Sequence, residues 1–265
     1  MITLSQLAIY PIKSTAQITL QKAQIGPFGL DMDRRWMLID ENGHMLTQRK
    51  HPQLCLVKCK LDDKYLTVSA PDTPLLKLPR QYPERFLRAT VWEDTCNSLD
   101  CGDDARKWFS SFLNIPARLV YFPRNEVRQV DLNFARQGDI TAFSDGFPYL
   151  LISQASLDEL NSRLDTPVEM RRFRPNLVIA GTEPFAEDNW KKIRIGDNTF
   201  NLVKPCSRCS IPSINPDTAQ QTAEVVKTLA GYRMQDNKIF FGQNVIADGS
   251  AELEVGMEVE ILKSC

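Results

Sequence analysis

The first hundred residues of the sequence break into short runs of alternating apolar and polar side chains, and turn-forming pairs separate these runs. The run "SQLAIYPI" predicts a strand, and "RRWMLIDENGHMLTQR" predicts two strands joined at Asn42-Gly43, a pair that favours tight hairpin turns. The run "QLCLVKCKLDDKYLTVSA" predicts another hairpin, which turns at Asp62-Asp63, and "RATVWEDTCNSLD" extends the set. Many short strands with tight turns are typical of a small barrel or sandwich.

Helices are predicted only beyond this region. The run "DDARKWFSSFL" follows Gly102 and places acidic residues in its first turn, where the helix dipole favours them. Helical spacing also marks "SQASLDELNSRL", with Ser153 or Ser156 as N-cap, and "DTAQQTAEVVKTLAGYR", with Gly231 as C-cap. The runs "NLVIAG", "KKIRIGDNTFNLVK" and "LEVGMEVEIL" return to strand. We therefore predict a mainly β (α+β) fold in which an all-β N-terminal module precedes a β-rich module with a few helices.

Composition limits the possible partners. The chain of 265 residues has a net charge of −1, with 43% hydrophobic and 25% charged residues, as expected of a folded soluble protein. Such a balance gives no general attraction to nucleic acid or to a membrane surface, so a bound anion must meet a local cluster of cations. No apolar run approaches the roughly 18 residues of a membrane span, and the N-terminus lacks the pattern of a signal peptide. We expect a cytoplasmic protein with reduced thiols.

The segment "KPCSRCSIP" places Cys206 and Cys209 three positions apart. A zinc site needs four ligands, and the other cysteines and the two histidines lack matching spacings. A thioredoxin-like redox pair needs a helix directly after the motif, which the following prolines oppose. Two reduced core cysteines are another reading. A thiolate ligand for a soft metal such as molybdenum or copper also fits, because Lys204 and Arg208 would lower the pKa of a neighbouring thiol.

Basic side chains recur in similar turn-like segments. Each is by itself an ordinary surface charge, but together they supply enough donors to surround one phosphate, for which the arginine fork is well suited. Pro175 should also keep the residue before it out of helical geometry. The candidates in "YPIKS", "DMDRRW" and "RRFRPN" are Lys13 with Ser14, Arg34 with Arg35, and Arg171, Arg172 and Arg174.

Seven motifs occur in an order that resembles the MOSC family. They are "YPIKS", "DRRWMLID", "FSDGFPYLLISQASL", "FRPNLVI", "KPCSRC", "NPDT" and "FGQN", and the likeness spans about residues 2 to 263. The chain is most similar to the members in which an N-terminal MOSC β-barrel module precedes a β-barrel MOSC domain, as in amidoxime-reducing components and bacterial YcbX-type proteins. The resemblance implies modules over residues 1–120 and 121–265, with a boundary between residues 85 and 125.

The resemblance implies a molybdenum cofactor, in which a pterin dithiolene and one protein cysteine hold the metal. The second cysteine of the motif is the ligand in the family, which makes Cys209 the expected catalytic and metal-binding residue here. The other positions that match cofactor contacts of the family are Lys13, Ser14, Arg34, Arg174, Ser207, Arg208 and Asn244, with Ser144 and Asp145 as further candidates on the same wall.

The implied reaction is reduction of N-hydroxylated compounds (hydroxylaminopurines, amidoximes and hydroxylamines) to amines. Some bacterial relatives carry a C-terminal ferredoxin domain, whereas this sequence ends at Cys265 without one. We therefore expect a separate electron donor, either a flavin reductase or a ferredoxin-like protein, and neither a nucleic acid nor a membrane partner. One alternative is a carrier of persulfide sulfur or of the molybdenum cofactor, as the related cofactor sulfurases suggest. Those enzymes add a pyridoxal-phosphate domain, for which this sequence has no room. The other alternative is a binding or structural module.

Overall fold

The computed structural model describes residues 1–265 and confirms a mainly β fold with twenty strands and three α-helices. One sheet dominates, in the order β2-β1-β14-β13-β18-β16-β15-β20, with β17 paired to β18. Neighbouring strands within this sheet are antiparallel, except that β13 and β14 are parallel. The strands of this sheet are β1 (Thr3–Ile9), β2 (Ile18–Leu20), β13 (Tyr149–Ser153), β14 (Leu177–Ala180), β15 (Trp190–Ile195), β16 (Asn198–Ser207), β17 (Met234–Gln235), β18 (Lys238–Asp248) and β20 (Val259–Ser264).

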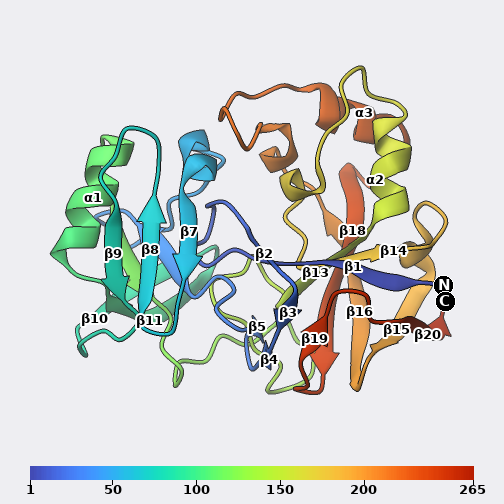
Figure 1. The fold of residues 1–265 in the computed structure, drawn as a ribbon, viewed down its shortest axis with the longest axis horizontal. Helices are drawn as coiled ribbons and strands as arrows, with labels where there is room; N and C mark the ends of the chain where they lie inside the picture. The colour runs from blue at the N-terminus through green and yellow to red at the C-terminus, as the bar shows by residue number, and fades with distance from the viewer.

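Smaller sheets build the rest of the molecule, and β7 to β11 lie on the side opposite β15 and β20 (Figure 1). A four-stranded sheet runs in the order β10-β11-β12-β6, and a three-stranded sheet runs in the order β7-β8-β9. The two remaining sheets are the pairs β4-β5 and β19-β3. The strands are β3 (Lys22–Ala23), β4 (Ile25–Gly26), β5 (Gly29–Leu30), β6 (Trp36–Ile39), β7 (Lys58–Leu61), β8 (Tyr65–Ser69), β9 (Leu76–Pro79), β10 (Phe86–Val91), β11 (Asp94–Asp100), β12 (Arg118–Tyr121) and β19 (Leu253–Glu254).

The helices lie at the periphery, with α1 beside the small sheets and α2 and α3 over one end of the large sheet (Figure 1). The helix bounds are α1 (Asp103–Leu113), α2 (Gln154–Asn161) and α3 (Glu224–Arg233), and the 3-10 turns are η1 (Pro52–Leu56), η2 (Met170–Arg172), η3 (Ala186–Asn189) and η4 (Ile211–Ser213). No helix of the structure combines the length and the apolar character required to cross a bilayer.

Strand pairing joins the beginning of the chain to its second half. Strand β1 pairs with β14, and β3 pairs with β19, so the first strands complete sheets made mostly of C-terminal residues. The main hydrophobic core also spans both halves, because it unites buried Leu7, Trp36 and Phe109 with buried Phe200. The boundary near residue 120 stays a prediction. The pairing shows that the two halves of the sequence are structurally interlocked.

Three predictions of local structure are confirmed. Helix α1 covers the predicted run, and β7 and β8 form the hairpin predicted at Asp62-Asp63. Ser153 caps α2, because its hydroxyl accepts a hydrogen bond from the backbone N–H of Ser156 at 3.1 Å.

Three predictions of local structure were wrong. The turn at Asn42-Gly43 forms, but its return arm makes only isolated bridges, one of them between His44 and Thr90, so the second strand is missing. The third helix begins only at Glu224, because a bridge between Ile214 and Gln221 holds the preceding residues in a loop. Gly231 lies inside α3, and the helix leads directly into β17 with an extended residue as its C-cap.

Candidate active site

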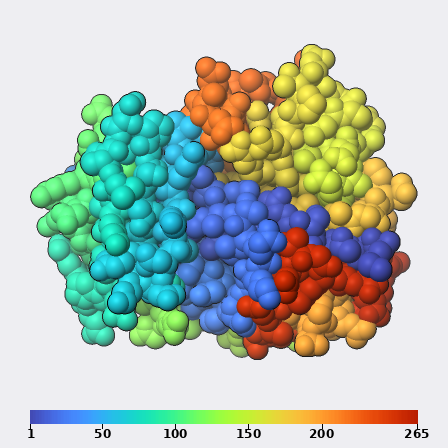
Figure 2. All heavy atoms as spheres, in the orientation of Figure 1, coloured from blue at the N-terminus to red at the C-terminus, as the bar shows by residue number.

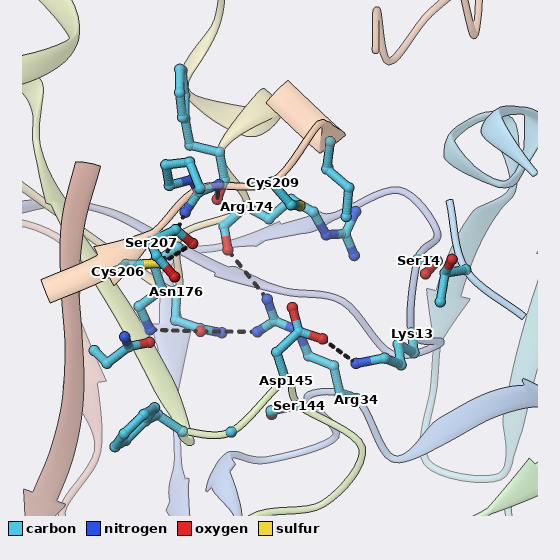
Figure 3. A pocket seen from close by; sticks show the side chains of 18 of the residues that line it. Lys13, Ser14, Arg34, Ser144, Asp145, Arg174, Asn176, Cys206, Ser207 and Cys209 are labelled. Carbon is cyan, nitrogen blue, oxygen red and sulfur yellow. Dashed lines mark hydrogen bonds and ion pairs between the residues drawn. The ribbon is translucent and has the colours of Figure 1, made fainter. Parts of the chain in front are cut away.

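One cavity of about 150 Å³ lies where the loops at the ends of several strands meet (Figure 3). The ten residues that match cofactor positions of the family all line it: Lys13, Ser14, Arg34, Ser144, Asp145, Arg174, Ser207, Arg208, Cys209 and Asn244. The other candidate phosphate ligands, Arg35, Arg171 and Arg172, do not line it. The ten lining residues come from chain segments as far apart as the loop after β1 and strand β18. The fold therefore brings the ten residues together, while their individual roles stay predictions.

The cavity contains an ion pair between a buried lysine and an exposed aspartate. Lys13 is buried, and its Nζ donates to Asp145 Oδ1 at 2.6 Å and to the carbonyl oxygen of Phe143 at 2.8 Å. Burial lowers the pKa of Lys13, although Asp145 opposes this effect. Partial loss of hydration raises the pKa of Asp145, but the Lys13 ammonium and the Trp92 indole N–H outweigh this effect and hold the pKa of this carboxyl well below its usual range. The side chain of Asp145 keeps 64% of its surface exposed, so the anion faces outward while its cation is buried.

Two arginines are fixed around Tyr10. Arg34 Nη1 donates to Asn176 Oδ1 at 2.9 Å and to the carboxylate of Asp33, and Arg34 Nη2 donates to the carbonyl of Arg174 at 3.2 Å. Arg174 Nη1 donates to the carbonyl of Thr15 at 2.7 Å. Both guanidinium groups lie over the Tyr10 ring, at 4.2 and 4.1 Å from its centroid. Burial lowers the pKa of Arg174 to about 10, so it stays charged at neutral pH.

Backbone conformation is strained at three of the cavity residues. Ser14, Arg34 and Arg174 have φ angles of 74°, 46° and 60°, in the left-handed region that residues other than glycine seldom adopt. Arg174 leaves helical geometry at the residue before Pro175, as the sequence predicted. Such strain persists only where the surrounding structure enforces it, and it clusters at functional sites. The hydrogen bonds of Arg34 and Arg174 provide that support.

The two cysteines of the "KPCSRC" motif differ in their surroundings. Strand β16 continues through Ser207, so Cys206 lies on a strand, whereas Cys209 lies in the loop before η4. Arg208 Nη1 contacts Cys206 Sγ at 3.2 Å, and Arg208 Nη2 donates to the carbonyl of Phe173 at 2.8 Å. Both thiols are half-buried and free, and no hydrogen bond engages the Cys209 side chain. Cys209 thus presents an unengaged thiol to the cavity.

Several buried polar atoms of the cavity have no partner in the protein. They are Ser144 Oγ, Arg208 Nε and Tyr149 OH. An unpaired buried polar group costs about 1–3 kcal/mol, so such atoms mark positions where a ligand or water completes the structure. No three His, Cys, Asp or Glu side chains come together in a group that could hold a metal ion. A metal in this cavity, which Cys206 and Cys209 both line, would therefore need further ligands from a second molecule.

Sequence reasoning missed three residues that organise the cavity. Asn176 is buried, accepts from Arg34 and donates through Nδ2 to the carbonyl of Ala8 at 3.1 Å. Asn176 belongs to the "FRPN" motif, and its side-chain amide can both donate and accept hydrogen bonds, so the sequence offered a signal for it. Trp92 and Arg128 gave no such signal, because their partners are distant in sequence.

Arg128 fixes the loop that carries Ser144 and Asp145. Its side chain is buried, and Nη1 donates to the carbonyls of Ala142 at 2.9 Å and Ser144 at 2.6 Å. Nη2 donates to the carbonyl of Asp145 at 3.1 Å, and Nε pairs with Asp94 at 2.7 Å. The side chain therefore ties β11 to one wall of the cavity.

The fold and the cavity define a class: a mainly β protein whose cation-lined cavity is suited to a small anionic ligand held beside a thiol. The chain belongs to the MOSC family. The family model for the MOSC N-terminal beta barrel domain matches residues 1–116, and the model for the MOSC domain matches residues 139–260. The family resemblance of the sequence motifs is thereby confirmed.

Curated relatives match most of the chain. "Mitochondrial amidoxime-reducing component 1" of Mus musculus is 38% identical, over 98% of this chain and 82% of the relative. The Homo sapiens protein of the same name is 36% identical, over 98% and 83% of the two chains. "Mitochondrial amidoxime reducing component 2" of Homo sapiens is 34% identical, over 88% and 73%.

Proposed function

We propose that this protein reduces N-hydroxylated compounds to amines with a molybdenum cofactor whose metal is held by Cys209. The proposal depends on one observation, that the Cys209 thiol and the Lys13, Arg34 and Arg174 cations line the same cavity. The names of relatives that match 98% of the chain support the reaction class, because those proteins are called amidoxime-reducing components. The net reaction adds two electrons and two protons to R–NHOH and yields R–NH₂ and water.

The residues present fit this cofactor by their chemistry. A thiolate suits molybdenum, and the cofactor's own dithiolene accounts for the lack of a further cluster of protein ligands. Lys13, Arg34 and Arg174 would hold its phosphate, while the unpaired Ser144 Oγ and Arg208 Nε offer hydrogen bonds to its polar atoms. When bound, the cofactor supplies the two-electron reduction that cleaves the N–O bond.

The chain itself fixes and balances charge in the cavity. The hydrogen bonds of Arg34 hold its guanidinium in place before any ligand arrives, which preserves the positive charge that an anion needs. The ion pair with Asp145 keeps the Lys13 ammonium in a buried position despite its lowered pKa. Asp145 stays ionised at neutral pH, so it accepts hydrogen bonds and does not supply the protons of the reaction.

We assign electron delivery to a separate protein. The seven cysteines are all free, and they form no group of three or more metal-ligand side chains. The chain thus offers no set of thiolates that could hold an iron–sulfur cluster. The word "component" in the names of the relatives agrees with a multiprotein system. The identity of the donor and the cytoplasmic location stay predictions.

Substitution of Cys209 tests the proposal. Protein from a molybdenum-replete host should contain molybdenum and reduce benzamidoxime with an artificial electron donor. Cys209→Ala should lose both the metal and at least about 100-fold of the activity, because Cys206, the other thiol of the cavity, is held by Arg208 and does not replace the ligand. Cys265→Ala, at an exposed position, serves as the matched control and should keep both.

Two results would contradict the proposal. Full molybdenum content in Cys209→Ala would rule out this residue as the ligand. Wild-type protein that contains no metal but carries a sulfur released by cyanide would indicate the sulfur-carrier function instead. Comparison of Cys206→Ala with Cys209→Ala then identifies which thiol holds that sulfur.

A further inference from the structure

A second cavity, of about 280 Å³, lies between the two sides of the molecule. Its walls come from the segment before β2, from η1 and the start of β7, from η2, and from the loop after η4. The corresponding blue, yellow and orange surfaces approach one another near the upper centre of Figure 2. The polar lining residues are Gln17, Gln48, Lys58, Arg171, Arg172 and Arg174.

The charge of this cavity is positive and incompletely balanced. Arg171 is neutralised, because it pairs with Glu169 and donates through Nη1 to Asp217 Oδ1 at 3.0 Å. Arg172 and Lys58 have no carboxylate partner, and no carboxylate lines the cavity. The only hydrogen bond of the Arg172 guanidinium is a long one, 3.4 Å, to the carbonyl of Pro212. Arg172 and Lys58 therefore remain free of ion pairs and open to an anion, although Glu169 and Asp217, which both pair with Arg171, weaken the positive field at Arg172.

A buried amide adds a different requirement. Gln48 lines the cavity with only 3% of its surface exposed, and its Oε1 atom has no hydrogen-bond partner. An acceptor buried in this way is costly unless a donor reaches it. The complementary ligand must consequently offer anionic oxygens to the cations and a hydroxyl donor to Gln48.

We propose that the second cavity binds hydrogen phosphate or a small phosphate ester that carries a hydroxyl group. Arg172 and Lys58 donate to the phosphate oxygens, and the ligand hydroxyl donates to Gln48 Oε1. The volume of about 280 Å³ leaves space for a short ester chain beside Ile18, Ile214 and Pro216.

This site is distinct from the first cavity. Arg172, Lys58 and Gln48 do not line the first cavity, and Arg174 is the only residue that lines both. The segment around Gln48 forms part of the division, because its neighbours Thr47 and Arg49 line the first cavity while Gln48 lines the second. Binding at the second site therefore requires neither the cofactor nor the proposed reaction.

Isothermal titration calorimetry of the full chain tests the proposal with inorganic phosphate, glycerol phosphate and sulfate. Sulfate matches phosphate in shape and charge but carries no proton at neutral pH, so it cannot donate to Gln48. We expect the wild-type protein to bind phosphate more tightly than sulfate. Tighter binding of glycerol phosphate would identify an ester as the ligand, and weaker binding would identify free phosphate.

Variants locate the binding. Arg172→Gln should weaken phosphate binding by about tenfold, as expected for loss of a charged hydrogen bond. Lys58→Gln, at an exposed position, should weaken it less. Gln48→Leu should remove the preference for phosphate over sulfate. Arg208→Gln, a matched change in the first cavity, should affect only phosphate bound in that cavity and should leave the affinity of the site that depends on Arg172 and Gln48 unchanged.

Three outcomes would overturn the proposal: equal affinity of the wild type for phosphate and sulfate, unchanged binding in Arg172→Gln, or loss of binding in Arg208→Gln. Circular dichroism verifies that each variant is folded. If Arg172→Gln does not fold, Arg172→Lys replaces it, since the ammonium keeps the charge but loses the fork and should still weaken binding.

Discussion

The two cavities use their cations in opposite ways. In the first cavity the basic side chains are already engaged: Lys13 with Asp145, Arg34 with Asp33 and Asn176, and Arg208 with the carbonyl of Phe173. In the second cavity Arg172 and Lys58 have no carboxylate partner. The basic side chains of the first cavity are thus fixed by contacts within the protein, whereas Arg172 and Lys58 of the second cavity are not fixed by an ion pair.

This difference indicates what kind of ligand each cavity suits. Side chains fixed in advance lose little conformational freedom on binding, which favours tight and long-lived binding of a resident group. Free cations gain more from a ligand, but ordering them costs entropy, which favours weaker and reversible binding. This contrast agrees with the proposed resident cofactor in the first cavity and with the proposed exchangeable ligand in the second.

Among the substitutions that test this comparison, the largest change in the free energy of unfolding should come from Arg128, whose hydrogen bonds fix one wall of the first cavity. Arg128→Gln should lower the free energy of unfolding by about 3 kcal/mol, because it leaves the carbonyls of Ala142, Ser144 and Asp145 without their charged donor. Urea denaturation measures the change. Arg136→Gln is the matched control, with a side chain that is 68% exposed and an expected cost below about 1 kcal/mol. Equal costs in the two variants would show that Arg128 does not hold the loop.

Asp145→Asn should cause a smaller loss in the free energy of unfolding, and this loss should depend on pH. Burial works against the ionised form, but Lys13 and Trp92 hold the folded pKa of Asp145 below its unfolded value. The ion pair therefore stabilises the fold fully above the unfolded pKa of about 4, and this stability is lost as pH falls through the folded pKa. Because the side chain is 64% exposed, we expect the difference to be only about 1 kcal/mol.

Urea denaturation of the wild type and Asp145→Asn between about pH 6 and pH 2 measures this difference. The gap in unfolding free energy should be largest at pH 6 and should close on acidification. Asp72→Asn, at an exposed position without an ion pair, is the control. A gap that widens on acidification would show that the interaction has the opposite sign.

Local structure could be predicted from the sequence because its signals are local. The N-cap of α2 needs only Ser153 and the residue three positions later, and the hairpin at Asp62-Asp63 needs only its turn and the flanking alternation. The same reasoning failed at Gly231, where glycine fits the inside of a helix that has no glycine cap. It also failed after Asn42-Gly43, where a good turn did not guarantee a second strand.

The candidate site was predictable only in part. Its ten residues were selected by their match to family motifs, and the fold explains their proximity by joining strands from both ends of the chain. Arg128 and Trp92 were out of reach, since their contacts to Ser144 and Asp145 depend on how loops pack across separate sheets. Gln48 was also out of reach, because a buried amide without a partner cannot be distinguished in sequence from an exposed one.

The smallest change in the free energy of unfolding should come from substitution of Arg172 in the second cavity. Burial lowers the pKa of Arg172, and the nearby carboxylates of Glu169, Asp217 and Glu224 oppose this effect only in part, since none forms an ion pair with Arg172. Without added anions, Arg172→Gln should therefore change the free energy of unfolding by no more than about 0.5 kcal/mol, far less than Arg128→Gln. Thermal denaturation in a phosphate-free buffer measures the change. The same concentration of added phosphate should then raise the midpoint of the wild type more than that of the variant, because a ligand stabilises the folded state in proportion to how tightly it binds it. If Arg172→Gln instead cost as much as Arg128→Gln, the two cavities would hold their cations in the same way and the contrast between them would be wrong.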